Sequence, residues 1–393
     1  MSRRKKGVSK SQQGMIVLLV TVLLAIAGVF YSLTGINPGG IFEVTDTPRV
    51  VATVTPFRSG DNSWWEVYFT DPVNIKDPNN YANSVAGRLV EHINAARVSI
   101  YIAAFEFDQT PIAEALIAAH NRGVDVRWVT DNQHGLDADE NPGRGQFARL
   151  RQAGIEVRGD TRTALMHNKF LVFDGRTVWT GSTNLTKNGF FVQDNNAIVI
   201  HSPEVAAVFT REFDEMWNGQ FGPRSPSQMT DQFVVVNGTP IQVIFTPEDS
   251  ALEQVIIPLV GQATSSIRFL AFSFTDYPLA KTMIDRAAAG VSVAGVMDKT
   301  QSGGQGSELG TLFCAKIAVR QDGNPQFMHS KVIIVDGRYV VTGSLNYSTS
   351  AEKSNDENVL IIDNPEIARL YLQNFEQVWY QASDPDPTKV TCQ

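Results

Sequence analysis

The chain has 393 residues, of which 43% are hydrophobic and 19% are charged. This length exceeds the size at which one hydrophobic core keeps growing, so we expect two domains of ordinary size. The composition excludes a disordered chain, a collagen-like chain and a protein with many membrane spans. The net charge is −8, but residues 1–42 hold five basic residues and no acidic one, which leaves 28 basic and 41 acidic residues elsewhere. So acidic a body argues against tight, non-specific binding of nucleic acid.

The first segment is a basic tail followed by an apolar run. The basic residues of the tail are Arg3, Arg4, Lys5, Lys6 and Lys10. The largely apolar run is long enough to cross a hydrocarbon core as a helix, at roughly 1.5 Å per residue. We therefore predict a cytoplasmic tail over 1–14, a transmembrane helix over 15–35 and a tether over 36–60, with the body extracytoplasmic and the protein single-pass in the cell membrane. The alternative is a signal peptide cleaved near Ala25-Ile26-Ala27, which would make the protein secreted.

The remaining body contains an internal repeat. The run from Ile100 to Phe107 recurs from Ile267 to Phe274. Runs typical of strands, such as 98–105, alternate with helical patterns, such as 111–122, which indicates a layered α/β sheet in each copy. We predict a first half over 61–217, a linker over 218–238, a second half over 239–383 and a tail over 384–393. A site shared by such halves would lie at their interface, and no oligomer would be required.

Each copy closes with a helical pattern that follows a capping residue. Ser202 precedes Pro203 in the first copy, and Asn364 precedes Pro365 in the second. Serine and asparagine are preferred caps, and proline is favoured at the first helical position. We therefore expect the two closing helices to begin at equivalent places.

The strongest similarity between the copies is polar. Residues 166–184 (MHNKFLVFDGRTVWTGSTN) and 328–346 (MHSKVIIVDGRYVVTGSLN) share 11 of 19 positions. Strand residues two apart lie on one face, so each histidine should lie beside the following lysine. A turn at Asp-Gly-Arg would bring back a strand that ends in Ser and Asn. The residues expected to converge are His167, Lys169, Ser182 and Asn184 with His329, Lys331, Ser344 and Asn346.

These side chains suit phosphoryl transfer. Lysine and asparagine can bind phosphate oxygens, one histidine can attack phosphorus, and the other can protonate the leaving alkoxide. No cluster has the spacing of metal ligands, so we expect neither a metal nor another cofactor. Asp174 and Asp336 either belong to this site or serve as ordinary turn residues before glycine. The histidines expected to be surface or packing residues are His92, His120, His134 and His201.

The motif H-x-K-x4-D-G-x5-G-S-x-N, present twice, resembles the paired HKD motifs of the phospholipase D superfamily over roughly residues 60–380. The resemblance implies a pseudo-twofold pair of α/β/α sandwiches, one active site at their interface, and a phosphohistidine intermediate formed without metal. It implies catalytic roles for His167, Lys169, Asp174, His329, Lys331 and Asp336. It also implies phosphate binding by Lys169, Lys331, Asn184 and Asn346, with support from Ser182 and Ser344.

The family pattern has a further acid after G-S-x-N. The second copy supplies it as Glu357, whereas the first copy has Asn195. A histidine nucleophile needs an acceptor for its remote ring nitrogen, and a carboxylate also stabilises the imidazolium. We therefore count Glu357 among the catalytic residues and expect it to contact His167 across the interface rather than His329.

Our interpretation is a membrane-anchored phosphodiesterase that hydrolyses phospholipids to phosphatidic acid and the head-group alcohol. Phospholipid and the membrane are then its partners, and the acidic body speaks against nucleic acid. A metal-independent nuclease of the same superfamily is the first alternative, and a non-catalytic binding or scaffold protein is the second. Histidine and lysine retained in both copies argue against the scaffold.

Overall fold

A computed structural model describes residues 63–227 and 232–392 of the chain. The basic tail, the predicted membrane helix or signal peptide, and the tether lie outside these residues, so their assignments stay predictions. Among the residues described, no helix is both long and apolar enough to span a membrane. The chain divides into one unit over 1–52 and another over 53–393, and everything below concerns the second unit.

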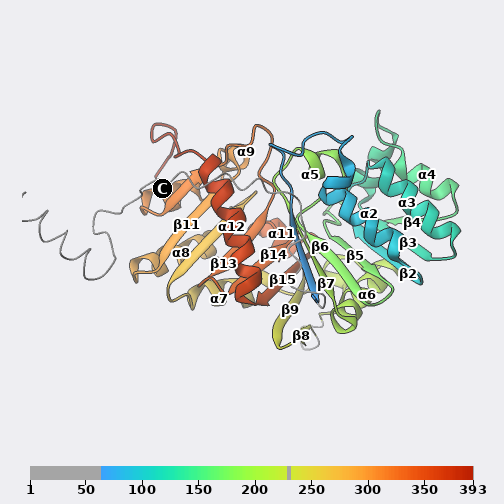
Figure 1. The fold of residues 1–393 in the computed structure, drawn as a ribbon. Helices are drawn as coiled ribbons and strands as arrows, with labels where there is room; N and C mark the ends of the chain where they lie inside the picture. The colour runs from blue at the N-terminus through green and yellow to red at the C-terminus, as the bar shows by residue number, and fades with distance from the viewer. Residues whose placement is uncertain (1–62, 228–231, 393) are drawn as a thin grey trace, which may run out of the picture. The chain divides into compact units, whose positions relative to one another are not determined.

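The first half is built on a seven-stranded mixed sheet with the order β1-β7-β6-β5-β2-β3-β4 (Figure 1). Its strands are β1 (Trp65–Phe69), β2 (Ser99–Ala104), β3 (Asp125–Thr130), β4 (Glu156–Gly159), β5 (Lys169–Phe173), β6 (Thr177–Gly181) and β7 (Asn196–His201). Its helices are α2 (Val85–Ala95), α3 (Thr110–Asn121), α4 (Gln146–Gln152), α5 (Lys187–Phe191) and α6 (Pro203–Trp217). Strands β2, β3 and β4 run parallel, and the other pairings are antiparallel.

The second half repeats this topology in an eight-stranded sheet with the order β12-β11-β10-β13-β14-β15-β9-β8. Its strands are β8 (Phe233–Val236), β9 (Thr239–Thr246), β10 (Ser266–Ala271), β11 (Ser292–Met297), β12 (Ala318–Gln321), β13 (Lys331–Val335), β14 (Tyr339–Gly343) and β15 (Glu357–Asp363). Its helices are α7 (Ile257–Gly261), α8 (Tyr277–Ala288), α9 (Lys299–Ser302), α10 (Leu309–Cys314), α11 (Thr349–Lys353) and α12 (Pro365–Gln381). Strand β8 lies inside the segment expected as a linker, where it pairs with β9.

Short 3-10 or π turns complete the structure. They are η1 (Tyr81–Asn83), η2 (Asn132–Leu136), η3 (Asp137–Glu140), η4 (Gly222–Arg224) and η6 (Leu252–Ile256). The predicted caps of the two closing helices are confirmed. The Ser202 hydroxyl accepts the amide of Val205 at 3.3 Å, and the Asn364 side chain accepts that of Ile367 at 3.1 Å.

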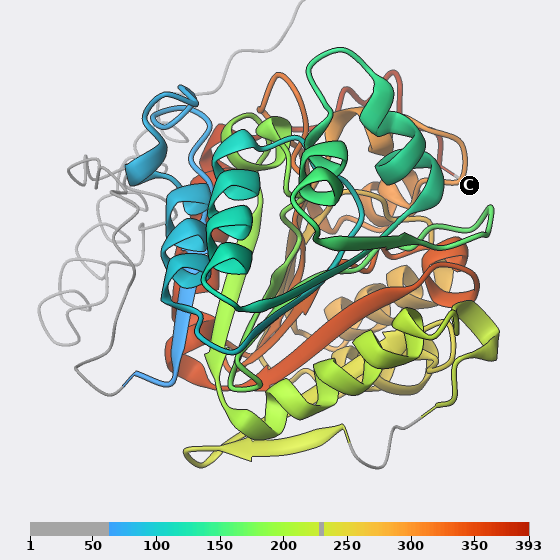
Figure 2. The ribbon, with the colours of Figure 1, turned by 90° about the vertical axis from the view of Figure 1, so that its right-hand side faces the viewer.

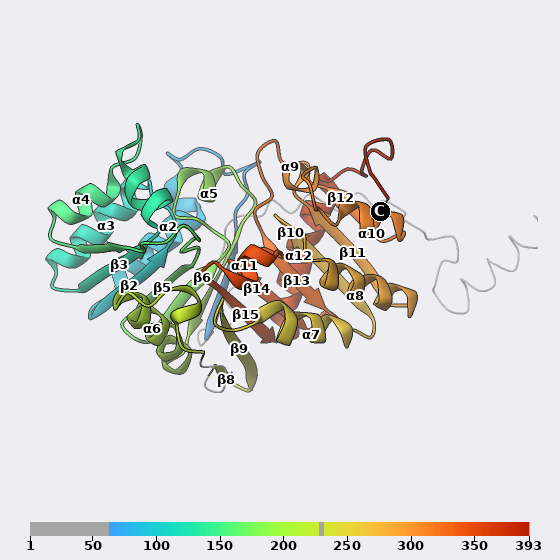
Figure 3. The same cartoon turned by 180° about the vertical axis from the view of Figure 1, so that it is seen from behind.

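Helices cover both faces of each sheet, so each half is an α/β/α sandwich. Figure 2 shows the first sheet between α2 and α3 on one side and α6 on the other. In the second half α12 covers one face, and α7, α8 and α11 cover the opposite face, which is seen from behind in Figure 3.

One hydrophobic core runs through both halves. Phe209 of α6 contacts the ring of Phe245 on β9 with centroids 5.4 Å apart, and Tyr371 of α12 contacts Phe69 on β1 at 5.2 Å. Each closing helix therefore packs against its own sheet and against a strand of the other half. Because burial of these rings is shared, the two halves fold together as one body.

Candidate active site

Backbone pairing across the interface places each histidine next to a segment of the other half. The amide of His167 donates to the carbonyl of Asp356 at 2.8 Å, and the amide of His329 donates to the carbonyl of Asp194 at 2.9 Å. The residue that follows this carbonyl begins β15 in the second half and directly precedes β7 in the first half. The pairing therefore sets Glu357 beside His167 and Asn195 beside His329.

Glu357 supports His167. The Nδ1 atom of His167 lies 2.6 Å from Oε2 of Glu357, and both side chains are buried. Burial lowers the pKa of His167 well below its usual value, and the charges of Lys169 and Lys331 lower it further. The neutral ring then carries its proton on Nδ1, towards the carboxylate, and leaves a lone pair on Nε2.

Asn195 takes the equivalent place beside His329. The Nδ1 atom of His329 lies 3.0 Å from Oδ1 of Asn195 and 3.2 Å from the carbonyl oxygen of Ser182. Both neighbours are acceptors, so Nδ1 is protonated in the neutral ring. Burial, followed by the charges of Lys331 and Lys169, lowers the pKa of His329 well below its usual value. The two imidazoles therefore share a geometry but differ in charge support.

Two buried ammonium groups accompany the imidazoles. The Nζ atom of Lys169 donates to the carbonyl of His167 at 2.8 Å, and that of Lys331 to the carbonyl of His329 at 2.6 Å. Burial lowers the pKa of Lys169 to about 8 and, with the charge of Lys169, lowers that of Lys331 well below its usual value. Across the described ranges neither ammonium forms an ion pair. An anion bound between them would supply the missing charge.

The predicted serines act on the residues that support the histidines. The hydroxyl of Ser182 donates to Oδ1 of Asn195 at 2.8 Å. In the second half, Ser344 hydrogen-bonds Glu357. The Ser344 hydroxyl also accepts the backbone amide of Asn358 at 3.0 Å, just as the Ser182 hydroxyl accepts that of Asn196. The side-chain amide of Asn355 also donates to Glu357, at 3.2 Å. Glu357 is thus fixed by donors, although burial raises its pKa to about 7.

The two predicted asparagines have buried side-chain oxygens. The Oδ1 atoms of Asn184 and Asn346 have no hydrogen-bond partner in the described protein. The amide nitrogen of Asn184 donates to Oε1 of Glu106 at 3.2 Å. Phosphate binding by Asn184 therefore requires this amide to share its donors between Glu106 and the substrate.

Asp174 and Asp336 are not brought to the histidines, which corrects their assignment as catalytic residues. Asp174 lies in the β5–β6 turn, five residues beyond Lys169, which is roughly 17 Å along a strand. Its carboxylate accepts the backbone amides of Arg97, Val98 and Ser99 at 2.7 to 3.0 Å.

Asp336 does the same in the β13–β14 turn, where it accepts the amides of Thr264, Ser265 and Ser266. Both aspartates have a positive φ, near 54°, a backbone region that aspartate tolerates better than most residues. Their recurrence in the repeat therefore reflects a structural anchor for the start of a neighbouring strand.

Two pairs of residues at the site were not anticipated. The rings of Phe105 and Phe272 lie 4.9 and 4.7 Å from those of His167 and His329. The carboxylates of Asp131 and Asp298 accept the backbone amides of the methionines that precede the two histidines, at 3.2 and 3.1 Å. Their signal was present in the repeat, because all four occupy identical positions in the two copies.

One of the histidines expected to be a surface or packing residue lies at the rim of the site. His134 packs on Phe105 with ring centroids 4.9 Å apart and approaches Asp131 at 3.1 Å. Its charge also contributes to lowering the pKa of His167, after burial and the lysines. Sequence alone could not find it, since its counterpart in the second copy is Gln301.

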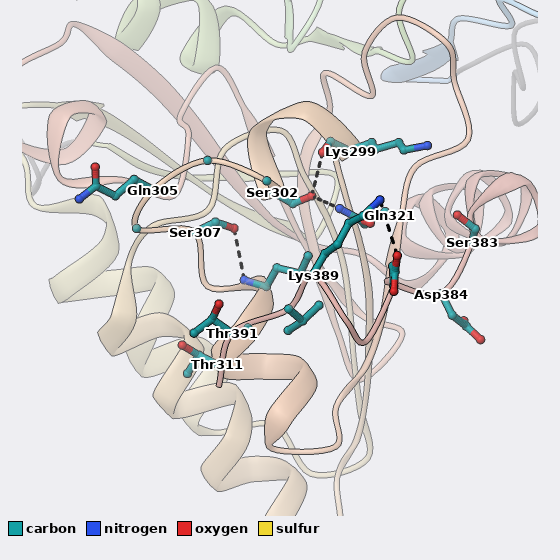
Figure 4. Close-up of a pocket in the computed structure, with 17 residues that line it drawn as sticks. Lys299, Ser302, Gln305, Ser307, Thr311, Gln321, Ser383, Asp384, Lys389 and Thr391 are labelled. Carbon is teal, nitrogen blue, oxygen red and sulfur yellow. Dashed lines mark hydrogen bonds and ion pairs between the residues drawn. The ribbon is translucent and has the colours of Figure 1, made fainter. Parts of the chain in front are cut away.

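A separate polar hollow of about 670 Å³ lies in the second half (Figure 4). Its walls come from residues within 299–311, from Gln321 and from C-terminal residues within 383–391. A disulfide between Cys314 and Cys392 ties this C-terminal segment to α10. None of the predicted site residues lines the hollow, so it is distinct from the histidine cluster. In the described part of the chain, no group of three or more His, Cys, Asp or Glu residues could hold a metal ion.

Comparisons with known proteins agree with this geometry. The family described as "Cardiolipin synthase, PLD-like domain" matches residues 89–217 and 256–379. A mitochondrial cardiolipin hydrolase of Homo sapiens is 35% identical over 175 residues, which cover 42% of this chain and 68% of the relative. A phospholipase D of Rickettsia bellii is 37% identical over 135 residues, 34% of this chain and 67% of the relative.

The fold also matches a solved structure over most of the chain. The crystal structure of phosphatidylserine synthase from Haemophilus influenzae superposes with a TM-score of 0.57, covering 76% of this chain and 84% of that one. Its sequence is only 17% identical, so the likeness concerns the fold alone. The family match spans both halves and includes both histidine motifs. The chain therefore belongs to the phospholipase D superfamily.

Proposed function

We propose that this protein is a membrane-anchored phospholipase D that hydrolyses phospholipids to phosphatidic acid and the head-group alcohol. Membership of the superfamily supports phosphodiester hydrolysis, and relatives named as a cardiolipin hydrolase and a phospholipase D support a lipid substrate. The observation that carries the proposal is the pair of buried ammonium groups beside two imidazoles. They form a cationic site with a nucleophile on one side and a proton donor on the other.

The first step forms a bond between Nε2 of His167 and phosphorus and breaks the bond to the leaving oxygen. Glu357 holds Nδ1 and stabilises the positive charge that develops on the ring. His329 donates a proton to the leaving alkoxide. The bound phosphate offsets Lys331 and Lys169, the charges that lower the pKa of His329, so this ring can take up its proton when substrate binds.

The second step is hydrolysis of the phosphohistidine. His329, now neutral, accepts a proton from water, and the water oxygen attacks phosphorus. The bond between phosphorus and Nε2 of His167 then breaks, and phosphatidic acid leaves as an anion. Lys169 and Lys331 stabilise the negative charge on the phosphate oxygens in both transition states.

The disulfide supports the extracytoplasmic placement, because such bonds persist where thiols are not kept reduced. Protease added to intact cells should then digest the body. Protection of the body from protease would reverse the proposed topology. Release of the body into the medium would instead favour a cleaved signal peptide.

The test of the activity uses the purified full chain in one buffer. The substrates are vesicles of phosphatidylcholine, phosphatidylethanolamine or cardiolipin, and single-stranded DNA. Release of head group or phosphatidic acid from a lipid, without cleavage of DNA, would support the proposal. Cleavage of DNA alone would establish the nuclease instead, and inactivity on all substrates would favour the scaffold.

A further inference from the structure

A further difference between the two halves lies on the wall of the active site, after the strands β2 and β10. Phe105-Glu106-Phe107 follows β2, whereas Phe272-Ser273-Phe274 follows β10. The flanking phenylalanines have the same surroundings in both halves, since the first ring lies beside a histidine and the second is buried. Glu106 and Ser273 are therefore equivalent, and only the first half carries an acid there.

Glu106 lies beside the phosphate-binding groups. Its Oε1 atom accepts the side-chain amide of Asn184 at 3.2 Å, and its Oε2 atom accepts Nη2 of Arg144 at 2.8 Å. The side chains of Glu106 and Arg144 are 22% and 24% exposed, so both are partly accessible. The charge of Glu106 also acts on Lys169, whose pKa burial lowers and nearby acids partly restore. The carboxylate is thus close to the site and open to it.

The conformation of the loop around Arg144 is fixed by two glycines and by hydrogen bonds. Gly143 and Gly145, on either side, have φ values of 85° and 95°, which side-chain-bearing residues rarely adopt. The carboxylate of Asp139 accepts the amide of Gly145 at 3.0 Å, and Nη1 of Arg144 donates to the carbonyl of His134 at 3.2 Å. The corresponding loop of the second half is shorter and has no arginine.

A carboxylate beside an anion site repels the phosphate unless it makes a compensating contact. Each oxygen of Glu106 accepts one hydrogen bond from the protein and keeps a lone pair that can accept another. We propose that Glu106, held by Arg144 and Asn184, selects substrates whose alcohol carries a hydroxyl or primary ammonium donor. This rests on the proposed phospholipase activity. A trimethylammonium group offers no such donor, so choline lipids would leave the remaining lone pairs of Glu106 without a donor.

The experiment compares phosphatidylethanolamine with phosphatidylcholine in vesicles at equal surface fraction. The wild-type chain should prefer phosphatidylethanolamine, and Glu106→Gln should lower the ratio of the two kcat/KM values about tenfold, as expected for the loss of one charge-assisted hydrogen bond. Glutamine keeps an oxygen for Asn184 but presents an N–H donor to Arg144 in place of Oε2, so the ion pair with Arg144 is lost. Soluble bis(p-nitrophenyl) phosphate reports the chemistry without a head-group donor and shows that the variant is folded.

The control variant is Glu114→Gln on α3, an exposed glutamate whose oxygen lies 3.3 Å from Arg149. It should leave the ratio unchanged. A ratio that Glu106→Gln changes by less than about twofold would overturn the inference, as would an equal loss on all three substrates, which would make Glu106 only a positioning residue for Asn184. If the wild type cleaves bis(p-nitrophenyl) phosphate but neither lipid, the proposed function fails together with the inference.

Discussion

Replacing Glu357 by glutamine tests whether the negative charge beside His167, which His329 lacks, contributes to catalysis. The variant keeps the shape of the side chain and an acceptor for Nδ1 of His167, but it removes a buried negative charge 2.6 Å from the ring. A hydrogen bond to a charged group contributes about 1.5–3 kcal/mol, which corresponds to a loss of roughly 10- to 100-fold in turnover. The loss should fall on kcat, because the imidazolium develops only as the reaction proceeds.

The pH profile gives an independent readout. Burial raises the pKa of Glu357 to about 7, so wild-type activity should fall below about pH 7 as the carboxylate takes up a proton. Glu357→Gln should lack this acidic limb. The control is Glu352→Gln, which changes another buried glutamate that accepts the amide of Leu252 at 2.9 Å, away from the histidines. A Glu357→Gln variant with more than about a third of wild-type kcat would refute the argument.

The other predictions concern the histidines, chelation and stability. His167→Ala and His329→Ala should each abolish nearly all turnover, and the double variant should be little worse; more than about a tenth of the rate in either single variant would contradict their roles. Full activity should persist in excess EDTA, and loss restored by a divalent ion would overturn the metal-independent mechanism. Burial raises the pKa of Asp322 to about 6, although the nearby backbone amides of Asn324 and Gly323 partly offset this rise. Since a raised carboxyl pKa reduces stability as pH rises from about 4 towards 7, Asp322→Asn should add about 1–3 kcal/mol to the unfolding free energy at pH 8, as denaturant unfolding would show. The equivalent Asp160 accepts the amide of Asn132 at 2.9 Å and lies 3.8 Å from Arg162, so Asp160→Asn should gain less.

Much of the site could be predicted because its polar residues recur at equivalent positions in both copies of the internal repeat. His167 and Lys169 recur as His329 and Lys331 in segments that a turn explains only in part, and strand periodicity places each pair on one face. The contact between Glu357 and His167 was expected from the chemistry of a nucleophilic histidine, and the structure has it.

Recurrence in the repeat also led us to expect catalytic roles for Asp174 and Asp336, and this expectation was wrong. Repetition shows that a position matters, but it does not distinguish a catalytic carboxylate from one that anchors backbone amides. Only the fold shows that these aspartates lie at the far end of the strand. Conversely, Glu106 and Arg144 escaped attention because they break the repeat, and their contact joins residues 38 positions apart through a loop whose path depends on tertiary packing.

Each histidine is supported by a residue of the other half, and this arrangement affects how the two sides of the site can evolve. His167 depends on Glu357 and His329 depends on Asn195, so neither half alone contains a complete histidine and its support. In a dimer of identical chains, every substitution would appear on both sides of such a site. Joining the copies in one chain removes that constraint. One side could keep a carboxylate behind its histidine while the other exchanged it for an amide, and one wall could gain Glu106 while the other kept Ser273. The two histidines can thus be tuned separately by single mutations.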